Sequence, residues 1–210
     1  MYEQFCSSIY INKDGKMKAE KSQNESALVY AAQRGDTEAL QLLLMRNWSW
    51  LRGLVYGVLN DANDVDDCLQ DICVRVINKI DSLRQPERFR PWLAVLARRQ
   101  ALRNRQQRAA RPAGLDDEVI QSQLDEKAKI FENIIDKEQC QQIIQAIKLL
   151  PEKYREVFMM QYSGDLTYAQ IAEILDIPIT TVQIRLVRAR KMIYEKVMKT
   201  QINTGSLDMD

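Results

Sequence analysis

The clearest hydrophobic pattern in the chain runs from residue 61 to residue 80. Asp61 is placed to cap a helix, and apolar residues then recur at spacings of three and four, which follow one face of an α-helix. These apolar positions are Val65, Cys68, Leu69, Ile72, Cys73, Val76, Ile77 and Ile80. The polar residues Asp67, Gln70 and Asp71 lie off this stripe. The pattern predicts an amphipathic helix with a buried apolar face and a polar, acidic outer face.

Helical spacing continues through most of the remaining chain, and no segment alternates convincingly as a β-strand. Further helices are predicted over 27–34, ending before Gly35, and over 37–47, 49–59, 92–107, 138–150 and 152–162, with a possible short helix at 126–135. We therefore expect an all-α protein. Residues 1–23 are polar and irregular, and Met17 is a possible alternative start of the chain.

The composition divides the chain into two helical domains. Pro112, Gly114 and the acidic residues after them are typical of a linker. We predict a first domain over 24–111, a linker over 112–137 and a second domain over 138–200. The extension 1–23 and the tail 201–210 are expected to be disordered or flexible.

Residues 166–193, LTYAQIAEILDIPITTVQIRLVRARKMI, have the pattern of a helix-turn-helix. Thr167 with Gln170, and Thr180 with Gln183, are spaced as helix-capping pairs on either side of a tight turn at 176–179. In the second helix the residues that recur at inward spacings are Val182, Leu186, Ala189, Ile193 and Val197. In this motif the second helix enters the DNA major groove.

The outward residues of that second helix are candidates for contact with DNA. Gln183, Ile184, Val187, Arg188 and Lys191 lie opposite the apolar side, where Gln and Arg can read base edges, and Arg185 and Arg190 lie at the flanks, where phosphate contacts are natural. Thr181 completes the predicted surface. A packed helical hairpin with a solvated basic face is the alternative, but the tight turn, the two capping pairs and the outward Arg and Gln residues favour DNA binding.

The net charge of +1 hides an uneven distribution. Residues 84–111 contain nine arginines and one acid, Glu87, while 115–138 is acidic on balance and 185–199 is basic. Like charges on one helix repel, so an arginine-rich helix without acidic partners indicates an anionic ligand. Phe89 and Trp92 lie beside these arginines, although Trp92 follows the apolar side and is better explained as a core residue.

Several classes of function are disfavoured by composition. The chain has no histidine, which removes the commonest general base and metal ligand, and its four cysteines form no CxxC pair. We therefore expect no enzymatic activity, no metal and no cofactor. No apolar run is long enough to span a membrane and no signal peptide is visible, so we expect a cytoplasmic protein without membrane insertion.

Three sequence blocks together resemble the sigma-70 family, in its extracytoplasmic-function subgroup. GDTEALQLLL at 35–44, and DANDVDDCLQDIC followed by VRVINKIDSLRQPERFRPWLAVLARR, are similar to region 2 of that family. Residues 151–158 with 166–190, including the IP…TV…R…RAR pattern, look like region 4. The resemblance covers about 25–111 and 138–199, and it implies a sigma factor that directs RNA polymerase core to promoters.

The resemblance also implies three binding surfaces and their partners. Asp67, Gln70 and Asp71 would contact the clamp helices of the largest polymerase subunit, and the polymerase flap would be a second contact. The second-helix surface of Thr181, Gln183, Ile184, Arg185, Val187, Arg188, Arg190 and Lys191 would read the −35 promoter element as duplex. The −10 element would be bound and melted by Arg84, Arg88, Phe89, Arg90, Arg98, Arg99, Arg103 and Arg105. In the free chain, either an anti-sigma factor or docking of the two domains on each other would hide these surfaces.

Some positions depart from the family pattern. The family commonly has Asn at the position of Arg99, often has Gly at Asp176 and Thr180, and usually has a basic residue at Gln183 and a small one at Ile184. The preferred promoter sequence therefore cannot be copied from relatives.

Two other functions stay open at this point. A dimeric helix-turn-helix regulator without affinity for polymerase would need a dimerisation helix, and it leaves the basic segment 84–111 unexplained. A nucleic-acid-processing enzyme would need catalytic carboxylates near the basic surface. The dense acids available for that role are Asp64, Asp66, Asp67 and Asp71.

Overall fold

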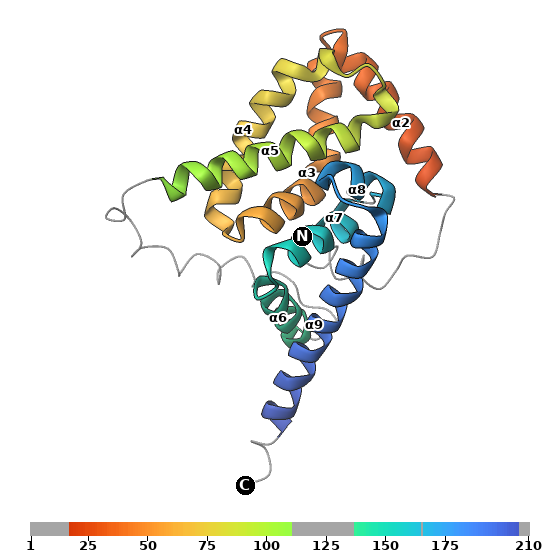
Figure 1. Cartoon of the computed structure of the whole chain (residues 1–210). Coiled ribbons are helices and arrows are strands. Elements are labelled where there is room, and N and C mark those ends of the chain that lie inside the picture. The colour runs from red at the N-terminus through yellow and green to blue at the C-terminus, as the bar shows by residue number, and fades with distance from the viewer. Residues whose placement is uncertain (1–16, 111–136, 165, 206–210) are drawn as a thin grey trace.

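The computed structural model describes residues 17–110, 137–164 and 166–205, and within them it contains helices and no strands, as predicted (Figure 1). The helices are α2 (Met17–Gln33), α3 (Thr37–Leu59), α4 (Ala62–Lys79), the 3-10 turns η1 (Ile80–Ser82) and η2 (Pro86–Arg88), α5 (Phe89–Ala109), α6 (Lys137–Lys148), α7 (Glu152–Gly164), α8 (Tyr168–Leu175) and α9 (Ile179–Gly205). The predicted linker over 112–137, except for its last residue, and the possible helix at 126–135 lie outside the described residues, so the domain bounds stay predictions.

Helices α2–α5 form an N-terminal bundle whose helix ends are fixed by short polar side chains. The Asp36 side chain accepts a hydrogen bond from the backbone N–H of Ala39 (3.0 Å), and that of Asp61 accepts one from the N–H of Asn63 (2.9 Å). Gly35 adopts a left-handed conformation at φ +89° after α2. These are ordinary N-terminal caps and helix stops, so the sequence places most helix boundaries correctly.

Helix α3 is continuous where two helices were predicted, over 37–47 and 49–59. Asn47 lies at the expected break, but it is fully buried and hydrogen-bonded rather than exposed in a turn. Its side-chain amide donates to the Leu43 carbonyl (2.8 Å) and its oxygen accepts from the Trp50 indole N–H (2.5 Å). Because these bonds satisfy the Asn47 side chain inside the bundle, the polar residue does not interrupt the helix. Helix α2 is also longer than predicted and begins at Met17.

Helix α4 confirms most of the apolar stripe. Val65, Cys68, Leu69, Ile72, Val76 and Ile80 are buried. The prediction was wrong for Ile77, which is 55% exposed, and only partly correct for Cys73, which is half-buried. Burial, with smaller contributions from Asp71 and Asp64, raises the pKa of the Cys68 thiol to about 12. Cys68 therefore behaves as a core residue and not as a reactive thiol.

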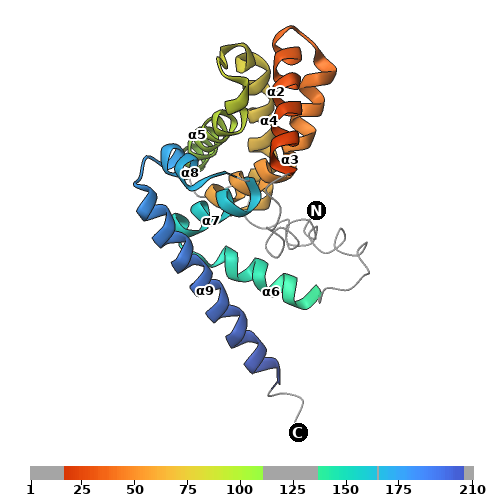
Figure 2. The ribbon, with the colours of Figure 1, turned by 90° about the vertical axis from the view of Figure 1, so that its right-hand side faces the viewer.

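Helices α6–α9 form a C-terminal bundle, in which α8 and α9 make the predicted helix-turn-helix (Figure 2). The capping box at Thr167 and Gln170 is present, and Asp176 ends α8 in a left-handed conformation at φ 54°. The prediction that Thr180 caps the next helix was wrong, because α9 already begins at Ile179. The first backbone N–H groups of α9 donate instead to the Pro178 carbonyl, from Thr181 at 2.9 Å and from Val182 at 3.2 Å.

Helix α9, with 27 residues, is the longest of the described helices, and it projects beyond the C-terminal bundle towards the chain end (Figures 1 and 2). Its length does not make it a membrane span. Among the described residues, no helix combines the length and the apolar character that crossing a membrane requires.

The two bundles pack directly on each other through α3 and α7, with α8 beside α5 (Figures 1 and 2). Buried residues of both bundles belong to one hydrophobic cluster. Gly53 and Gly57 of α3 make the close approach possible. A Cβ on Gly53 would clash with Ser163 Oγ, and a Cβ on Gly57 would lie 3.1 Å from the Met159 Cβ. The sequence analysis did not identify this pair of glycines.

Candidate nucleic-acid interfaces

The outer face of α9 has the division into core and exposed sides that the spacing predicts. Val182, Leu186 and Ala189 are at most 1% exposed, which confirms them as core residues, whereas Ile193 and Val197 are only half-buried. Residues opposite them are exposed, including the apolar Ile184 (51%) and Val187 (62%). The exposed polar members are Gln183, Arg188, Arg190 and Lys191, while Thr181 and Arg185 are half-buried. The whole surface is therefore accessible to a ligand.

Two tyrosines of α7 contact arginines of α9, Tyr162 with Arg190 and Tyr154 with Arg188. The Arg190 Nε donates to the Tyr162 hydroxyl at 2.6 Å, and the Arg190 guanidinium lies 5.6 Å from the centroid of the same ring. A hydrogen bond with Arg188 is the main cause that lowers the pKa of Tyr154. Neither tyrosine was identified from the sequence as a partner of the arginines. Their contacts restrict the arginine side chains before any ligand binds.

Three arginines of the predicted −10 surface are paired with carboxylates of the C-terminal bundle. The closest nitrogen–oxygen distances are 2.6 Å for Arg88 with Glu173, 2.5 Å for Arg98 with Glu156 and 2.5 Å for Arg105 with Glu152. The second pair is the most buried, because the Glu156 side chain is 8% exposed and the Arg98 side chain 27%. In this structure the predicted DNA-binding arginines thus contribute to the interface between the bundles.

The other predicted −10 arginines lie away from that interface. Arg90 pairs with Glu25 of α2 at 3.0 Å. Arg84, Arg99 and Arg103 are exposed and make no ion pair with a carboxylate that the structure describes. Helix α5 therefore carries arginines on two sides, one facing the C-terminal bundle and one facing solvent.

The aromatic residues beside these arginines belong to the core. Phe89 is 1% exposed, so the prediction that its ring contacts the −10 strand does not fit this structure. Trp92 is half-buried, packs against the core cluster and has its ring centroid 5.9 Å from that of Phe89. This position fits the interpretation of Trp92 as a core residue and not as a DNA contact. Both rings lie on the side of α5 that packs against the core.

The predicted polymerase surface on α4 is exposed, and one of its members has a second role. Asp67 and Gln70 are open to solvent. Asp71 is exposed as well, but its carboxylate accepts hydrogen bonds from Gln100 (2.8 Å) and Asn104 (3.4 Å) of α5. Asp71 therefore ties α4 to α5. Two nearby acids are also paired, Asp66 with Arg52 and Asp64 with Arg108.

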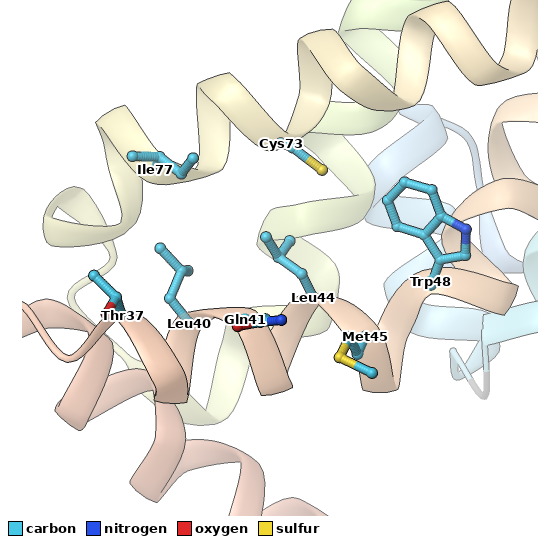
Figure 3. Close-up of a pocket in the computed structure, with 8 residues that line it drawn as sticks. All are labelled: Thr37, Leu40, Gln41, Leu44, Met45, Trp48, Cys73 and Ile77. Carbon is cyan, nitrogen blue, oxygen red and sulfur yellow. The ribbon is translucent and has the colours of Figure 1, made fainter.

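An apolar groove of about 690 Å³ lies between α3 and α4 (Figure 3). Its lining consists of Thr37, Leu40, Gln41, Leu44, Met45, Trp48, Cys73 and Ile77. This lining explains why Cys73 and Ile77 fit the apolar pattern of α4 without being buried. Gln70, Cys73 and Ile77 follow one side of α4 at spacings of three and four, so the groove borders the predicted polymerase surface.

Family models match both halves of the chain. The model of sigma-70 region 2 matches residues 43–111, and the model of sigma-70 region 4 matches residues 140–193. The first match contains α4 and α5, and the second contains the helix-turn-helix.

Curated relatives and solved structures agree with these matches. The ECF RNA polymerase sigma-E factors of Escherichia coli K12 and Salmonella typhimurium LT2 are each 30% identical over 180 residues, which cover 82% of this chain and 94% of theirs. The structure of CnrH in complex with the cytosolic domain of CnrY has a TM-score of 0.57 at 21% identity and covers 82% of this chain and 96% of that one. The sigma factor RpoE in complex with the anti-sigma factor NepR, from Bartonella quintana, has a TM-score of 0.57 at 18% identity and covers 75% and 96%.

Proposed function

Because the chain belongs to the extracytoplasmic-function sigma factors of the sigma-70 family, which direct RNA polymerase to promoters, we propose that its two basic surfaces divide one promoter between them. The −35 surface is the outer face of α9, made of Thr181, Gln183, Ile184, Arg185, Val187, Arg188, Arg190 and Lys191. The −10 surface is made of Arg84, Arg88, Arg90, Arg98, Arg99, Arg103 and Arg105. The observation that carries the proposal is that each bundle contributes one of these surfaces.

The −35 surface suits the major groove of duplex DNA. Arg188 and Gln183 have side chains that pair with base edges, and Ile184 and Val187 offer apolar contacts for a thymine methyl group. Arg185 and Arg190 at the flanks suit phosphate contacts, which fix the position of the helix. The hydrogen bond from Arg190 to Tyr162 supports this division, since it restrains a flanking cation.

The −10 surface suits a separated strand. Single-stranded DNA binds to grooves that combine positive charge along the backbone with surfaces for the bases. The arginines of α5 and of the turns before it supply the charge, and Phe89 is left to the core. We propose that Arg99 and Arg103, exposed on the solvent side of α5, make the first contacts with the strand and assist its melting.

The polymerase surface is proposed on the outer side of α4. Asp67 and Gln70, with Asp71 beside them, would contact the clamp helices of the largest polymerase subunit, and the C-terminal bundle would contact the flap. A partner helix lying along α4 would cover Gln70 and the groove lined by Cys73 and Ile77 together.

The remaining parts of the proposal follow from this assembly. A protein that acts with polymerase on promoters would work in the cytoplasm and by binding, without a catalytic residue, cofactor or metal of its own. The absence of histidine supports this. CnrH and RpoE were solved with the cytosolic domain of CnrY and with the anti-sigma factor NepR, and we propose an anti-sigma partner here as well.

The test is reconstitution with purified core polymerase. The chain should associate with core and direct initiation from a subset of a random promoter library. Asp67→Ala/Gln70→Ala should weaken association with core, while Glu38→Ala, an exposed acid at the start of α3, should not. A chain that neither binds core nor selects any promoter would overturn the proposal.

A further inference from the structure

The contact between the bundles pairs arginines that are proposed to bind DNA with glutamates of the other bundle. Arg88, Arg98 and Arg105 belong to the −10 surface, and each is paired with a different glutamate of the C-terminal bundle. Arg98 and Arg105 are seven residues apart and therefore share one side of α5. Carboxylates and phosphates are the two anions that arginine recognises with the same donor geometry. The three glutamates thus take the place of an anionic ligand on this surface.

The docking that brings these glutamates into place is built by specific features of both bundles. Gly53 and Gly57 lie one turn apart on α3 and admit α7 at backbone distance, with the Gly57 Cβ position 3.5 Å from the Glu156 Cα. Arg155, which is 7% exposed, reaches across and donates to the Gly57 carbonyl (3.1 Å) and to the Leu150 carbonyl of its own bundle (2.9 Å). Asn60 donates to the Lys148 carbonyl (3.3 Å).

We propose that Glu152, Glu156 and Glu173 are an intramolecular mimic of the DNA strand, which occupies the −10 surface of the free chain. The proposal rests on the −10 role given above. One arginine cannot pair fully with a glutamate and a phosphate at once, so binding of a strand on this side of α5 requires the bundles to separate. The −35 surface lies on the far side of α9 from its core residues and stays exposed in the docked form.

A consequence is that the free chain discriminates between forms of DNA. Duplex DNA can reach α9 without any rearrangement, while single-stranded DNA must compete with the three glutamates. Promoter binding by the polymerase complex places the bundles on separate elements, and this separation releases the arginines. The docked form therefore delays strand binding until the polymerase is present.

The test uses the full chain and a fluorescent single-stranded DNA of random sequence, about 12 nucleotides long. In Glu152→Gln/Glu156→Gln/Glu173→Gln the competing charges are removed and the side-chain shapes are kept. A chain whose open form is populated one time in ten binds about tenfold more weakly than one that is held open. The triple variant should therefore bind the strand about tenfold more tightly than the unmodified chain.

The matched control is Glu38→Gln/Asp81→Asn/Asp176→Asn, which removes the same number of charges from exposed residues outside the three ion pairs. A general effect of added positive charge would raise strand affinity equally in both variants, and this result would overturn the proposal.

Gly57→Leu tests the proposed mimic without changing charge. The larger side chain should wedge α7 away from α3, raise strand affinity and increase the radius of gyration measured by small-angle X-ray scattering. An unchanged strand affinity in a separated Gly57→Leu chain would contradict the mimic.

Reconstituted polymerase separates failure of this proposal from failure of the −10 assignment. Arg99→Ala/Arg103→Ala, which alters arginines outside the docked pairs, should reduce promoter opening. If promoter opening is unchanged, the −10 assignment itself is wrong. If opening falls but the triple glutamine variant binds the strand no better than its control, the −10 assignment stands and the mimic is wrong.

Discussion

The two proposed DNA-binding surfaces of this chain are built on helices of similar charge but differ in what faces them. The outer face of α9 meets solvent, and the arginine contacts that the structure gives it, to Tyr162 and Tyr154, are with uncharged rings of its own bundle. The interface side of α5, together with Arg88 just before it, meets three carboxylates of the other bundle. The outer face of α9 is thus open to a ligand, whereas the interface side of α5 is already paired with carboxylates of the same chain.

This difference suggests that the affinity of the chain for DNA and the access of DNA to the −10 surface are controlled by different contacts. Two of the three ion pairs, Arg88 with Glu173 and Arg105 with Glu152, are exposed, and exposed ion pairs contribute only about 0–1 kcal/mol each. The docked form must therefore depend mainly on the contact of α3 with α7 and on the buried side chains of Arg155 and Glu156, while the exposed pairs select which surface is covered.

The largest effect is expected for Arg155→Ala. The substitution leaves the buried carbonyls of Gly57 and Leu150 without a donor, which should lower the free energy of unfolding by about 2–4 kcal/mol. Chemical denaturation followed by circular dichroism measures this loss. Lys153→Ala, two residues away and exposed, is the control and should change stability by less than about 0.5 kcal/mol. Equal effects for the two variants would remove Arg155 from the docking argument.

Arg188→Ala should affect the −35 surface alone. Loss of a base-edge contact costs about 1–3 kcal/mol and relaxes the preference at one promoter position. Because α9 is exposed in the docked form, the loss should be the same for the free chain and for the polymerase complex. Binding to a set of single-base −35 variants measures it. A uniform loss across all variants would make Arg188 a phosphate contact instead.

Thr167→Ala should weaken the scaffold that positions α9. The Thr167 hydroxyl caps α8, and its loss should lower stability by about 1 kcal/mol. Thermal unfolding measures this change, and Thr180→Ala, at an exposed threonine that caps no helix, should leave stability nearly unchanged. The −35 affinity at low temperature should be nearly unchanged, since the groove-facing residues are retained. A large loss of specificity would show that the cap controls the orientation of α9 and not only its stability.

The smallest effects distinguish the two sides of α5. In the free chain Arg99→Ala removes an accessible cation and should weaken single-strand binding by up to about 1 kcal/mol and lower the salt slope by about 0.7. Arg98→Ala removes a cation but also a docking pair, so its net effect should be smaller. In the polymerase complex the two substitutions should become equivalent. Equal effects in the free chain would contradict the difference between the two sides.

Local sequence pattern was sufficient for most of the fold. The apolar stripe of α4, the capping box of Thr167 and the core residues Val182, Leu186 and Ala189 depend on neighbours within one helix, and the structure confirms them. The errors also have local causes. A polar Asn47 between aromatic residues resembles a helix break until its buried hydrogen bonds are known, and Thr180 resembles a cap although Pro178 already supplies the accepting carbonyl.

Contacts between distant segments could not be predicted in this way. The arginine-rich segment 84–111 has one acidic residue in sequence, from which an anionic ligand was predicted. The glutamates that pair with Arg98 and Arg88, Glu156 and Glu173, lie 58 and 85 residues further along the chain. The burial of Phe89 and the exposure of Ile77 depend on how the neighbouring helices pack against α5 and α4. The glycines of α3 gave no periodic signal, because their role is defined only by the helix that packs on them.

Site-specific photocrosslinking tests the central claim most directly. A benzophenone amino acid is placed at Val187 on the −35 surface or at Arg105 on the interface side of α5, and crosslinks are mapped with promoter DNA. In the free chain, the probe at Val187 should reach duplex DNA while the probe at Arg105 crosslinks to α7. In the polymerase complex, the probe at Arg105 should reach the −10 strand instead. Crosslinks from Arg105 to the strand in the free chain, or to α7 in the polymerase complex, would contradict the account.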